Sequence, residues 1–372
     1  MIMNDSKHFL YISTSKIERH RANLLQTFHT VQGFIRSGMG VQVLMPKPKK
    51  RINIKSKLES FNIHENINIH FTSFLNTRYK YFDYTLFLLR YHKFYNQYDH
   101  IYTRNPFISL ALCKRNIHHG FELHDLKWLY SHQLIDKVIS NYNRHIIKAI
   151  FCTASLSIDH LIKFGAKPDN LFHTPNGISP DRFQQLSPFN YSYQETPKVG
   201  FFGILRKNTV NFIEKLANTN VCRIIIVGHL PERHNLAQYP NIDIYPPVSY
   251  KDLANYFNLI DFIILPYQDT NLQEYNSINP LKLFEGMASG RPVICSDLPS
   301  IREVIRHREN GILVSSDDLD GWIDAIQDLK NDSTLAHHLS RQAVIDSRKY
   351  SWDNKALHIK HALYDLSFSN DS

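Results

Sequence analysis

The sequence predicts an α/β protein of two domains, each with a parallel β-sheet and helices on both faces of the sheet. Its 372 residues exceed the roughly 150 residues of one ordinary domain. Short apolar runs alternate with longer amphipathic stretches along the chain, which is typical of repeated βα units. A turn-rich segment, residues 176–197, is followed at once by a new apolar run, so we expect the second domain to begin there.

The short apolar runs are the predicted strands, because bounded runs of about 4 to 8 apolar residues are typical of buried parallel strands. In chain order they are His8 to Ile12, Val41 to Met45, Asn68 to Phe71, His100 to Tyr102, Ile150 to Thr153, Leu171 to Thr174, Val199 to Phe202, Arg223 to Val227, Ile242 to Tyr245, Phe262 to Leu265 and Pro292 to Ser296. The predicted helices between them are Arg21 to Arg36, Ile108 to Arg115, Leu129 to Tyr142, Ser155 to Lys163, Thr209 to Ala217, Tyr250 to Ile260 and Leu281 to Ala288.

These elements divide the chain into two Rossmann-like halves and a tail. We predict an N-terminal domain over residues 1–188 and a C-terminal domain over residues 189–350. Residues 351–372 contain a last helical segment, Asp353 to Leu366, which follows the final predicted strand. We expect this helix to pack back on the N-terminal domain.

Composition excludes several classes of protein. Apolar residues make up 43% and charged residues 21% of the chain, which is ordinary for a globular protein and excludes disorder and collagen-like repeats. No apolar stretch approaches the roughly 20 residues that span a bilayer, and the run Phe9 to Ile12 is too short for a signal peptide. Without a signal-peptide run, the cytoplasm is the expected location. The four cysteines have no CxxC spacing, so we expect reduced, mostly buried thiols.

The net charge of +9 indicates attraction to a polyanion. The basic residues gather in two stretches, Lys47 to Lys57 and, interleaved with aromatic residues, Arg78 to Lys93. Two interpretations stay open for them: a solvated loop and helix face, or a rim that rests on anionic lipid headgroups at the inner face of the cell membrane. Nucleic acid is the least favoured partner, because no recognisable binding module accompanies the charge.

The most informative segment runs from Ser277 to Pro292 and reads SINPLKLFEGMASGRP. Pro280 suits the first turn of a helix, where its missing N–H has no intrahelical partner. The N–H groups of Leu281 and Lys282 would then lie free at the positive end of the helix, an arrangement that binds a diphosphate. Glu285 follows one turn later, and its carboxylate can accept two hydrogen bonds from a ribose diol.

This segment resembles the retaining family 4 glycosyltransferases of GT-B fold, in which two Rossmann-like domains face a cleft. The family signature is Glu-x7-Glu followed by a small-residue helix and Gly-(Lys/Arg)-Pro-Val-Ile. Glu285 matches the second Glu, Gly290 to Ile294 matches the end of the signature, and Glu303 and Asn310 to Val314 continue the match. Ser277 stands where the family has its first Glu, which contacts the donor sugar, so the departure bears on the choice of sugar.

The resemblance implies donor-binding residues elsewhere in the second half. Gly203, with Arg206 or Lys207, resembles the start of the second domain, where basic residues hold the donor diphosphate together with Leu281 and Lys282. Ser277, Asn279 and Glu285 would contact the sugar and ribose, and Val248 lies in a segment similar to the loop that lines the base. Phe172 to Phe183, which contains Pro-Asn-Gly, resembles the family's interdomain segment.

In the first half, His124 is the predicted catalytic residue. Glu122-Leu123-His124-Asp125 resembles the acceptor-side segment of the family, where an imidazole approaches the donor sugar. Histidine can donate to a hydroxyl and titrates near neutral pH. Arg21 and Asn23, at the head of the first predicted helix, resemble the turn that faces the cleft on the acceptor side.

The resemblance implies transfer of a sugar from a UDP- or GDP-linked donor to a glycan or lipid-linked acceptor, with retention, in bacterial surface polysaccharide or glycoconjugate synthesis. It implies no cofactor and no metal, because helix-terminal N–H groups and basic side chains would meet the charge of the leaving diphosphate. Two alternatives stay open: a nucleotide-sugar epimerase of the same architecture, and a non-catalytic partner that binds glycan or nucleotide.

Overall fold

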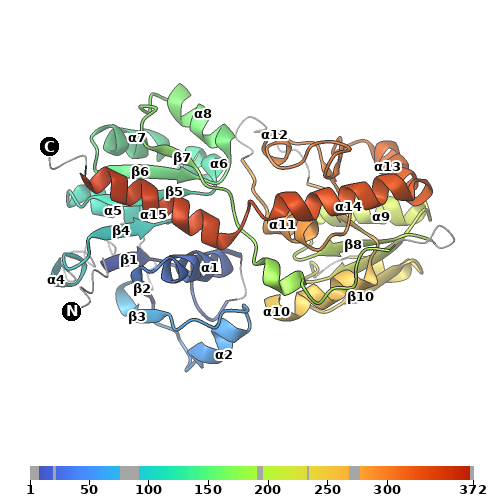
Figure 1. Ribbon diagram of the computed structural model, residues 1–372, viewed down its shortest axis with the longest axis horizontal. Coiled ribbons are helices and arrows are strands. Elements are labelled where there is room, and N and C mark those ends of the chain that lie inside the picture. The colour runs from blue at the N-terminus through green and yellow to red at the C-terminus, as the bar shows by residue number, and fades with distance from the viewer. Residues whose placement is uncertain are drawn as a thin grey trace.

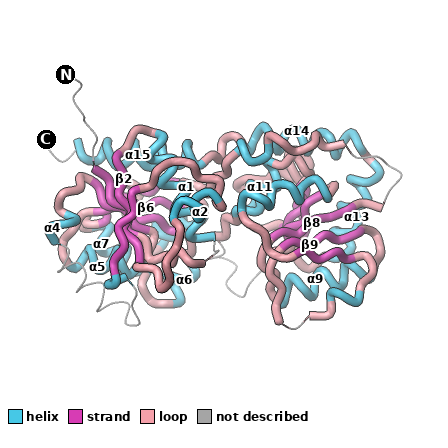
Figure 2. Tube along the Cα trace, turned by 90° about the horizontal axis from the view of Figure 1, so that it is seen from below, coloured by secondary structure: helices cyan, strands magenta, loops and turns pink. Residues whose placement is uncertain are grey.

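The protein consists of two α/β lobes that lie side by side (Figure 1). The structure, a computed structural model, describes residues 8–19, 22–75, 92–190, 196–232, 234–267 and 277–368. In each lobe the strands form a central sheet with helices on both sides (Figure 2). The predicted class, two Rossmann-like domains with parallel sheets, is confirmed.

The first lobe contains a parallel sheet with the strand order β3-β2-β1-β4-β5-β6-β7. Its strands are β1 His8–Ile12, β2 Gly40–Pro46, β3 Asn68–Thr72, β4 His100–Thr103, β5 His119–Leu123, β6 Ile147–Cys152 and β7 Leu171–His173. Its helices are α1 Ala22–Arg36, α2 Ile54–Glu59, the 3-10 turn Ser73–Leu75, α4 His92–Tyr95, α5 Pro106–Lys114, α6 Leu126–Ser131, α7 Ile135–Asn143 and α8 Ser155–Lys163. A 3-10 turn, Pro180–Phe183, lies in the connection to the second lobe.

The second lobe contains a parallel sheet with the order β10-β9-β8-β11-β12-β13. Its strands are β8 Lys198–Phe202, β9 Arg223–Val227, β10 Ile242–Tyr245, β11 Phe262–Leu265, β12 Val293–Ser296 and β13 Ile312–Val314. Its helices are α9 Lys207–Asn218, α10 Tyr250–Leu253, α11 Leu281–Ala288, α12 Pro299–Arg302, α13 Leu319–Asn331 and α14 Ser333–Ser347, with 3-10 turns at Leu236–Gln238 and Ala254–Leu259.

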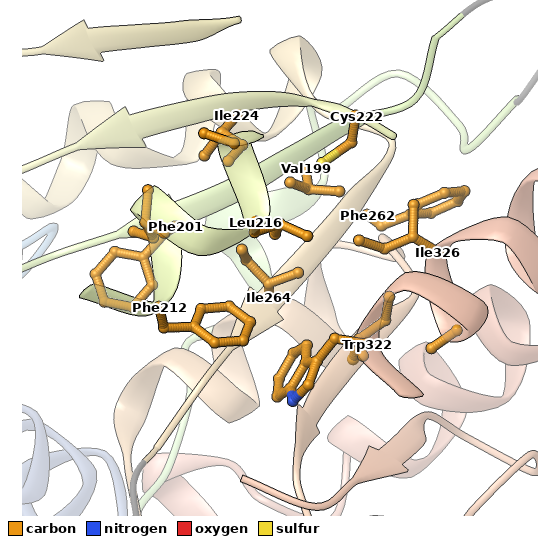
Figure 3. Close-up of a cluster of buried hydrophobic side chains, with 14 of the residues drawn as sticks. Val199, Phe201, Phe212, Leu216, Cys222, Ile224, Phe262, Ile264, Trp322 and Ile326 are labelled. Atoms are coloured by element: carbon orange, nitrogen blue, oxygen red, sulfur yellow. The ribbon is translucent and has the colours of Figure 1, made fainter. Parts of the chain in front are cut away.

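Buried apolar side chains fix the layers of the second lobe. On one face of its sheet, Val199, Leu216 and Ile264 lie at the centre of a cluster drawn from strands and a helix (Figure 3). The ring of Trp322 on α13 meets that of Phe212 on α9 with centroids 5.0 Å apart, which joins two helices on the same face. These contacts hold β8 and β11 in place, and the loops after these strands carry the candidate site.

The last helix, α15 Trp352–Phe368, leaves the second lobe and packs on the first (Figure 1). Its backbone comes so close to α1 that a Cβ atom on Gly33 would lie 2.7 Å from the Trp352 carbonyl oxygen. Arg36 of α1 also contacts Asp353, with 3.3 Å between guanidinium nitrogen and carboxylate oxygen. The chain therefore crosses the junction twice, once near residue 180 and once near residue 350.

Several predicted elements differ from the observed ones. The single helix expected over Leu129 to Tyr142 is broken into α6 and α7, because Gln133 adopts a left-handed conformation with φ of 53°. The helix expected over Tyr250 to Ile260 is α10 followed by a 3-10 turn. Strands β5 and β13 and helices α13 and α14 were not predicted.

The four cysteines are buried and free, as expected. None of the helices in the described residues is long and apolar enough to cross a membrane. Of the two basic stretches, Lys47 to Lys57 spans the connection from β2 into α2, whereas most of Arg78 to Lys93 lies outside the described residues.

Candidate active site at the junction of the lobes

The carboxyl ends of both sheets face the junction between the lobes. Glu303, after α12, accepts hydrogen bonds from the backbone N–H groups of Ser155 (2.9 Å) and Leu156 (3.1 Å), which begin the helix after β6. Asn279, between β11 and α11, accepts at Oδ1 from the N–H of Asn176, which follows β7, at 2.7 Å. Ligands of open α/β sheets bind outside the carboxyl ends of the strands, so this junction is the candidate site.

In the second lobe, the loop after β8 and the start of α11 bring predicted diphosphate-binding residues together. Lys282 lies directly over Gly203, since a Cβ atom there would be 2.5 Å from Lys282 Cε. Gly203 has φ of +128°, a conformation that favours glycine. The ammonium of Lys282 lies 4.1 Å from the centre of the Phe201 ring. The Lys282 side chain can therefore lie here only because residue 203 has no side chain.

Electrostatics link this lysine to two other predicted residues. Burial lowers the pKa of Lys282 to about 8, an effect that the Glu285 carboxylate opposes and the Arg206 guanidinium increases. Arg206 is exposed at the N-terminal cap of α9, and Lys207 is exposed as the first residue of that helix. Of these two alternatives, Arg206 is the one whose charge acts on Lys282.

Helix α11 begins at Leu281, with Pro280 as its cap residue instead of its first helical residue. The cap makes no side-chain hydrogen bond to the helix. Because the first N–H groups of a helix have no intrahelical partner, those of Leu281 and Lys282 form a donor pair at its positive end. The helix thus has the predicted bounds and exposes the predicted N–H groups, and only the place of Pro280, at the cap instead of in the first turn, differs.

Glu285 is buried and paired with Arg182, a residue that the sequence analysis did not single out. The Arg182 Nη1 donates to Glu285 Oε1 at 2.9 Å, and the side chains are 1% and 7% exposed. Arg182 also donates to the Tyr250 carbonyl at 2.6 Å, and its guanidinium carbon lies 3.3 Å from the centre of the Tyr250 ring. The only signal for Arg182 was its place at the end of the predicted interdomain segment, Phe172 to Phe183.

Ser277 and Asn279, the other predicted sugar or ribose ligands, are 4% and 8% exposed. The Asn279 backbone carbonyl accepts from the side-chain amide of Asn176 at 2.6 Å. Within the part of the chain that the structure describes, the Asn279 Nδ2 donor is buried without a hydrogen-bond partner. A buried unpaired donor is costly, and a sugar hydroxyl is a group that could satisfy it.

In the first lobe, His124 follows β5 and rests against a buried carboxylate. Its Nε2 lies 2.7 Å from Glu122 Oε1, at ion-pair distance but without the angle of a hydrogen bond. Glu122 also accepts from Lys355 Nζ at 2.6 Å and from the Tyr102 hydroxyl at 2.8 Å. Burial lowers the pKa of His124 to about 4, and the charge of Arg104 adds to this. The imidazole is therefore neutral at neutral pH.

The remaining predicted residues are less central. Val248 is half-buried and packs on the apolar cluster under β9 and β11. Asn23 is exposed near the start of α1, and its carbonyl accepts from Arg104 at 3.2 Å. Arg21 lies outside the described residues. Among the described residues, no group of three His, Cys, Asp or Glu side chains is placed to hold a metal ion.

Comparison with solved structures identifies the architecture. Sucrose-phosphate synthase from Thermosynechococcus elongatus superimposes with a TM-score of 0.75, at 16% identity, over 98% of this chain and all of the other. The Anabaena protein Alr3699/HepE, solved with UDP and glucose, superimposes with a TM-score of 0.72, at 14% identity, over 96% of this chain and all of the other. The protein has the GT-B fold.

Sequence comparison finds a similarity that lies mainly in the second lobe. Residues 196–332 match the family described as glycosyl transferases group 1. A D-inositol 3-phosphate glycosyltransferase from Paenarthrobacter aurescens is 25% identical over 185 residues, which are 48% of this chain and 43% of the relative. The chain thus spans about half the length of the relatives that it matches. The matched family region includes Gly203, Lys282 and Glu285.

Proposed function

We propose that the protein is a glycosyltransferase that moves a sugar from a UDP- or GDP-linked donor to a glycan or lipid-linked acceptor. The observation that carries this proposal is the position of Lys282 at the start of α11, over Gly203 and one turn before Glu285. A cation, free helical N–H groups and a carboxylate at this spacing suit a diphosphate joined to a ribose. The match of this region to glycosyl transferases group 1 supports the same reading.

In the proposed complex, the donor lies mainly on the second lobe. Lys282, Arg206 and the N–H groups of α11 hold the diphosphate. Glu285, oriented by Arg182, accepts from the ribose hydroxyls, and Val248 lies near the base. Asn279 and Ser277 face the sugar, and Ser277 offers a neutral hydroxyl where a carboxylate would bind more strongly. The proposal does not depend on a particular base, and both UDP- and GDP-linked sugars are candidates.

The proposed reaction breaks the bond between the anomeric carbon and the diphosphate oxygen, which leaves with the electron pair. An acceptor hydroxyl oxygen forms the new bond on the same face of the sugar, and its proton passes to the departing phosphate oxygen, so the configuration is retained. Preorganised donors stabilise charge that develops on a leaving group. Lys282 and the α11 N–H groups supply this stabilisation without a metal, and neutral His124 hydrogen-bonds the sugar from the first lobe.

A direct test is to incubate the protein with UDP- and GDP-linked sugars, with and without acceptors, and to measure released nucleoside diphosphate and glycosylated product. UDP-glucose and D-inositol 3-phosphate are natural first choices, because Alr3699/HepE has been solved with UDP-glucose and a similar sequence is a D-inositol 3-phosphate glycosyltransferase. We expect glycosylated product with at least one combination of donor and acceptor. The same product should form in the presence of EDTA, which removes divalent metal ions. If the donor is epimerised and keeps its nucleotide, the protein is an epimerase. If it binds the donor without turnover, it is a non-catalytic partner. Either result would overturn the proposal that it transfers a sugar.

The donor site has its own test in Glu285→Gln. The amide keeps an oxygen for Arg182, so the buried arginine retains a partner, whereas the charge that strengthens the ribose bonds is lost. We expect the donor to bind about tenfold or more weakly, since hydrogen bonds to charged groups contribute about 1.5 to 3 kcal/mol. Glu309→Gln, at an exposed ion pair with Arg306, is the control. Equal affinity in both variants would remove Glu285 from the donor site.

We also propose peripheral contact with anionic membrane through the basic stretch Lys47 to Lys57. Cations near a charged leaflet contribute about 1 kcal/mol each. Flotation with vesicles of phosphatidylglycerol and phosphatidylcholine measures this contact. We expect binding that declines with salt and with Lys49→Gln/Lys50→Gln/Arg51→Gln, and no difference between the variant and the native chain would exclude this stretch as the contact.

A further inference from the structure

Lys355 is a fully buried cation on α15, and its partner is the carboxylate beside the predicted catalytic histidine. Its Nζ donates to Glu122 Oε1 at 2.6 Å and to the Thr174 carbonyl at 3.2 Å. The same oxygen, Glu122 Oε1, lies 2.7 Å from His124 Nε2. The lysine and the imidazole therefore share one carboxylate oxygen, although Lys355 and Glu122 are 233 residues apart in sequence.

The pair is a poor means of stabilising the fold. Both side chains are 2% exposed, so folding removes two charges from water. The attraction between buried ions often only offsets the cost of removing them from water, and apolar residues of similar volume serve equally well. Other residues on the same face of α15, such as Trp352, Ala356 and Ile359, are indeed apolar and buried. A buried lysine at this position calls for a reason other than packing.

We propose that Lys355 is a positioning residue for His124: by holding Glu122 Oε1, it fixes the carboxylate on which the imidazole rests and so orients the ring for contact with the donor sugar. This inference rests on the proposed function only for the role of His124 in transfer. The contact between Lys355, Glu122 and His124 stands on the geometry alone. Through this contact, helix α15, which follows the second lobe in the chain, helps to position a residue of the first lobe.

The charges around His124 show how the lysine acts. The ionisable groups that face this site come from β1, β4 and the loop after it, β5 and α15: they are Tyr11, Tyr102, Arg104, Glu122 and Lys355. Burial and then Arg104 lower the pKa of His124, Glu122 raises it, and Lys355 lowers it again. Without Lys355, the charge of the Glu122 carboxylate would be less offset and the pKa of His124 would be higher. With it, the carboxylate can orient the ring while its charge is partly balanced.

A neutral imidazole can accept a hydrogen bond from a sugar hydroxyl. An imidazolium can only donate, so protonation would remove that acceptor.

The test compares Lys355→Met with Lys360→Met in the full chain. Lys360 lies on the same helix but donates to the Ser37 carbonyl at 2.6 Å, so its loss loosens α15 without touching Glu122. NMR titration of the imidazoles, with His124 assigned from a His124→Gln spectrum, gives its pKa directly. We expect the pKa of His124 to rise by about one unit or more in Lys355→Met, as the loss of a nearby like charge predicts, and to stay unchanged in Lys360→Met.

Activity supplies the second readout. In Lys355→Met, kcat should fall about tenfold because the carboxylate that orients the imidazole is no longer fixed, while KM for the donor stays nearly constant. The acid limb of the pH profile should move to higher pH. Equal losses in both lysine variants, with the pKa of His124 unchanged, would make Lys355 a structural residue and overturn the inference.

Lys355→Met leaves Glu122 buried without its main cation and can fail to fold. In that case Glu122→Gln and Glu122→Gln/Lys355→Met are compared: equal kcat in the two, below that of the native chain, supports a role of Lys355 through Glu122, whereas a further loss of kcat in the double variant overturns the inference. If the native chain transfers no sugar from any donor, the proposed function fails, but the NMR comparison still decides whether Lys355 controls His124.

Discussion

Arg182 and Glu285 form an ion pair that ties the connection between the lobes to helix α11, with 2.9 Å between Nη1 and Oε1. Both side chains are almost fully buried, and the Tyr250 carbonyl accepts a second bond from the same guanidinium. The carboxylate predicted to bind ribose is therefore already oriented by the protein. A site of this kind needs little rearrangement when a ligand binds, which favours affinity.

Replacing Arg182 should destabilise the protein strongly. Arg182→Met leaves the Glu285 carboxylate buried and uncompensated, and we expect a loss of about 3 to 5 kcal/mol in the free energy of unfolding by urea. The control is Arg302→Met: its pair with Asp297 has side chains that are 61% and 29% exposed. Exposed pairs contribute at most about 1 kcal/mol. Similar small losses in both variants would show that the Arg182 pair is not buried in solution.

Binding of a nucleoside diphosphate should depend on pH through Lys282. Burial lowers the pKa of Lys282 to about 8, so the ammonium is charged below that pH and neutral above it. A bound anion favours the charged form, and affinity measured by calorimetry should therefore fall as the pH rises through about 8. Lys282→Arg should remove this dependence, because the guanidinium stays charged. The same decline in the arginine variant would assign the dependence to another group.

Glu303 should control how firmly the lobes are held together. The cap residue of α8, Ala154, makes no side-chain hydrogen bond, and Glu303 of the other lobe supplies the missing acceptor. Glu303→Ala should cost about 1 kcal/mol, the usual contribution of a helix cap, and should broaden the distances between spin labels placed on the two lobes. Glu309→Ala is the control, since its partner Arg306 is three residues away on the same surface. Identical distance distributions would mean that this contact does not hold the lobes.

His29 should make the protein sensitive to acid. Its ring is buried, stacked on Trp352 with centroids 5.6 Å apart, and its Nδ1 lies 3.1 Å from Gln32 Oε1. Burial lowers its pKa to about 3, against 6.5 in an unfolded chain, so the unfolded state binds the extra proton first. This contribution to stability is complete above about pH 6.5 and should be lost towards pH 3 at up to roughly 1.4 kcal/mol per pH unit.

Denaturation at several pH values measures that slope. His29→Gln should flatten it, whereas His64→Gln, at an exposed position between α2 and β3, should leave it unchanged. If the native chain and His29→Gln lose stability in parallel below pH 6, other groups cause the acid sensitivity.

Local patterns in the sequence were sufficient for most strands of the two sheets and for the start of helix α11. Strands such as β9 Arg223–Val227 and β11 Phe262–Leu265 have the predicted bounds, because bounded apolar runs become buried strands whatever surrounds them. Helix α11 Leu281–Ala288 likewise has the predicted residues. Its first N–H groups and the spacing from Lys282 to Glu285 are properties of the helix itself, so they could be inferred without tertiary contacts.

Only the tertiary structure decided which charges are buried together. Strand β5 was missed because it contains His119 and Glu122, both of them buried, and polar residues break the apolar pattern of a strand. A carboxylate can be buried there because Lys355 reaches it from a helix 233 residues further along the chain. Glu285 likewise meets Arg182 across 103 residues. A buried charge requires a partner of opposite sign, and a local pattern holds no information about a partner that the fold brings from so far away.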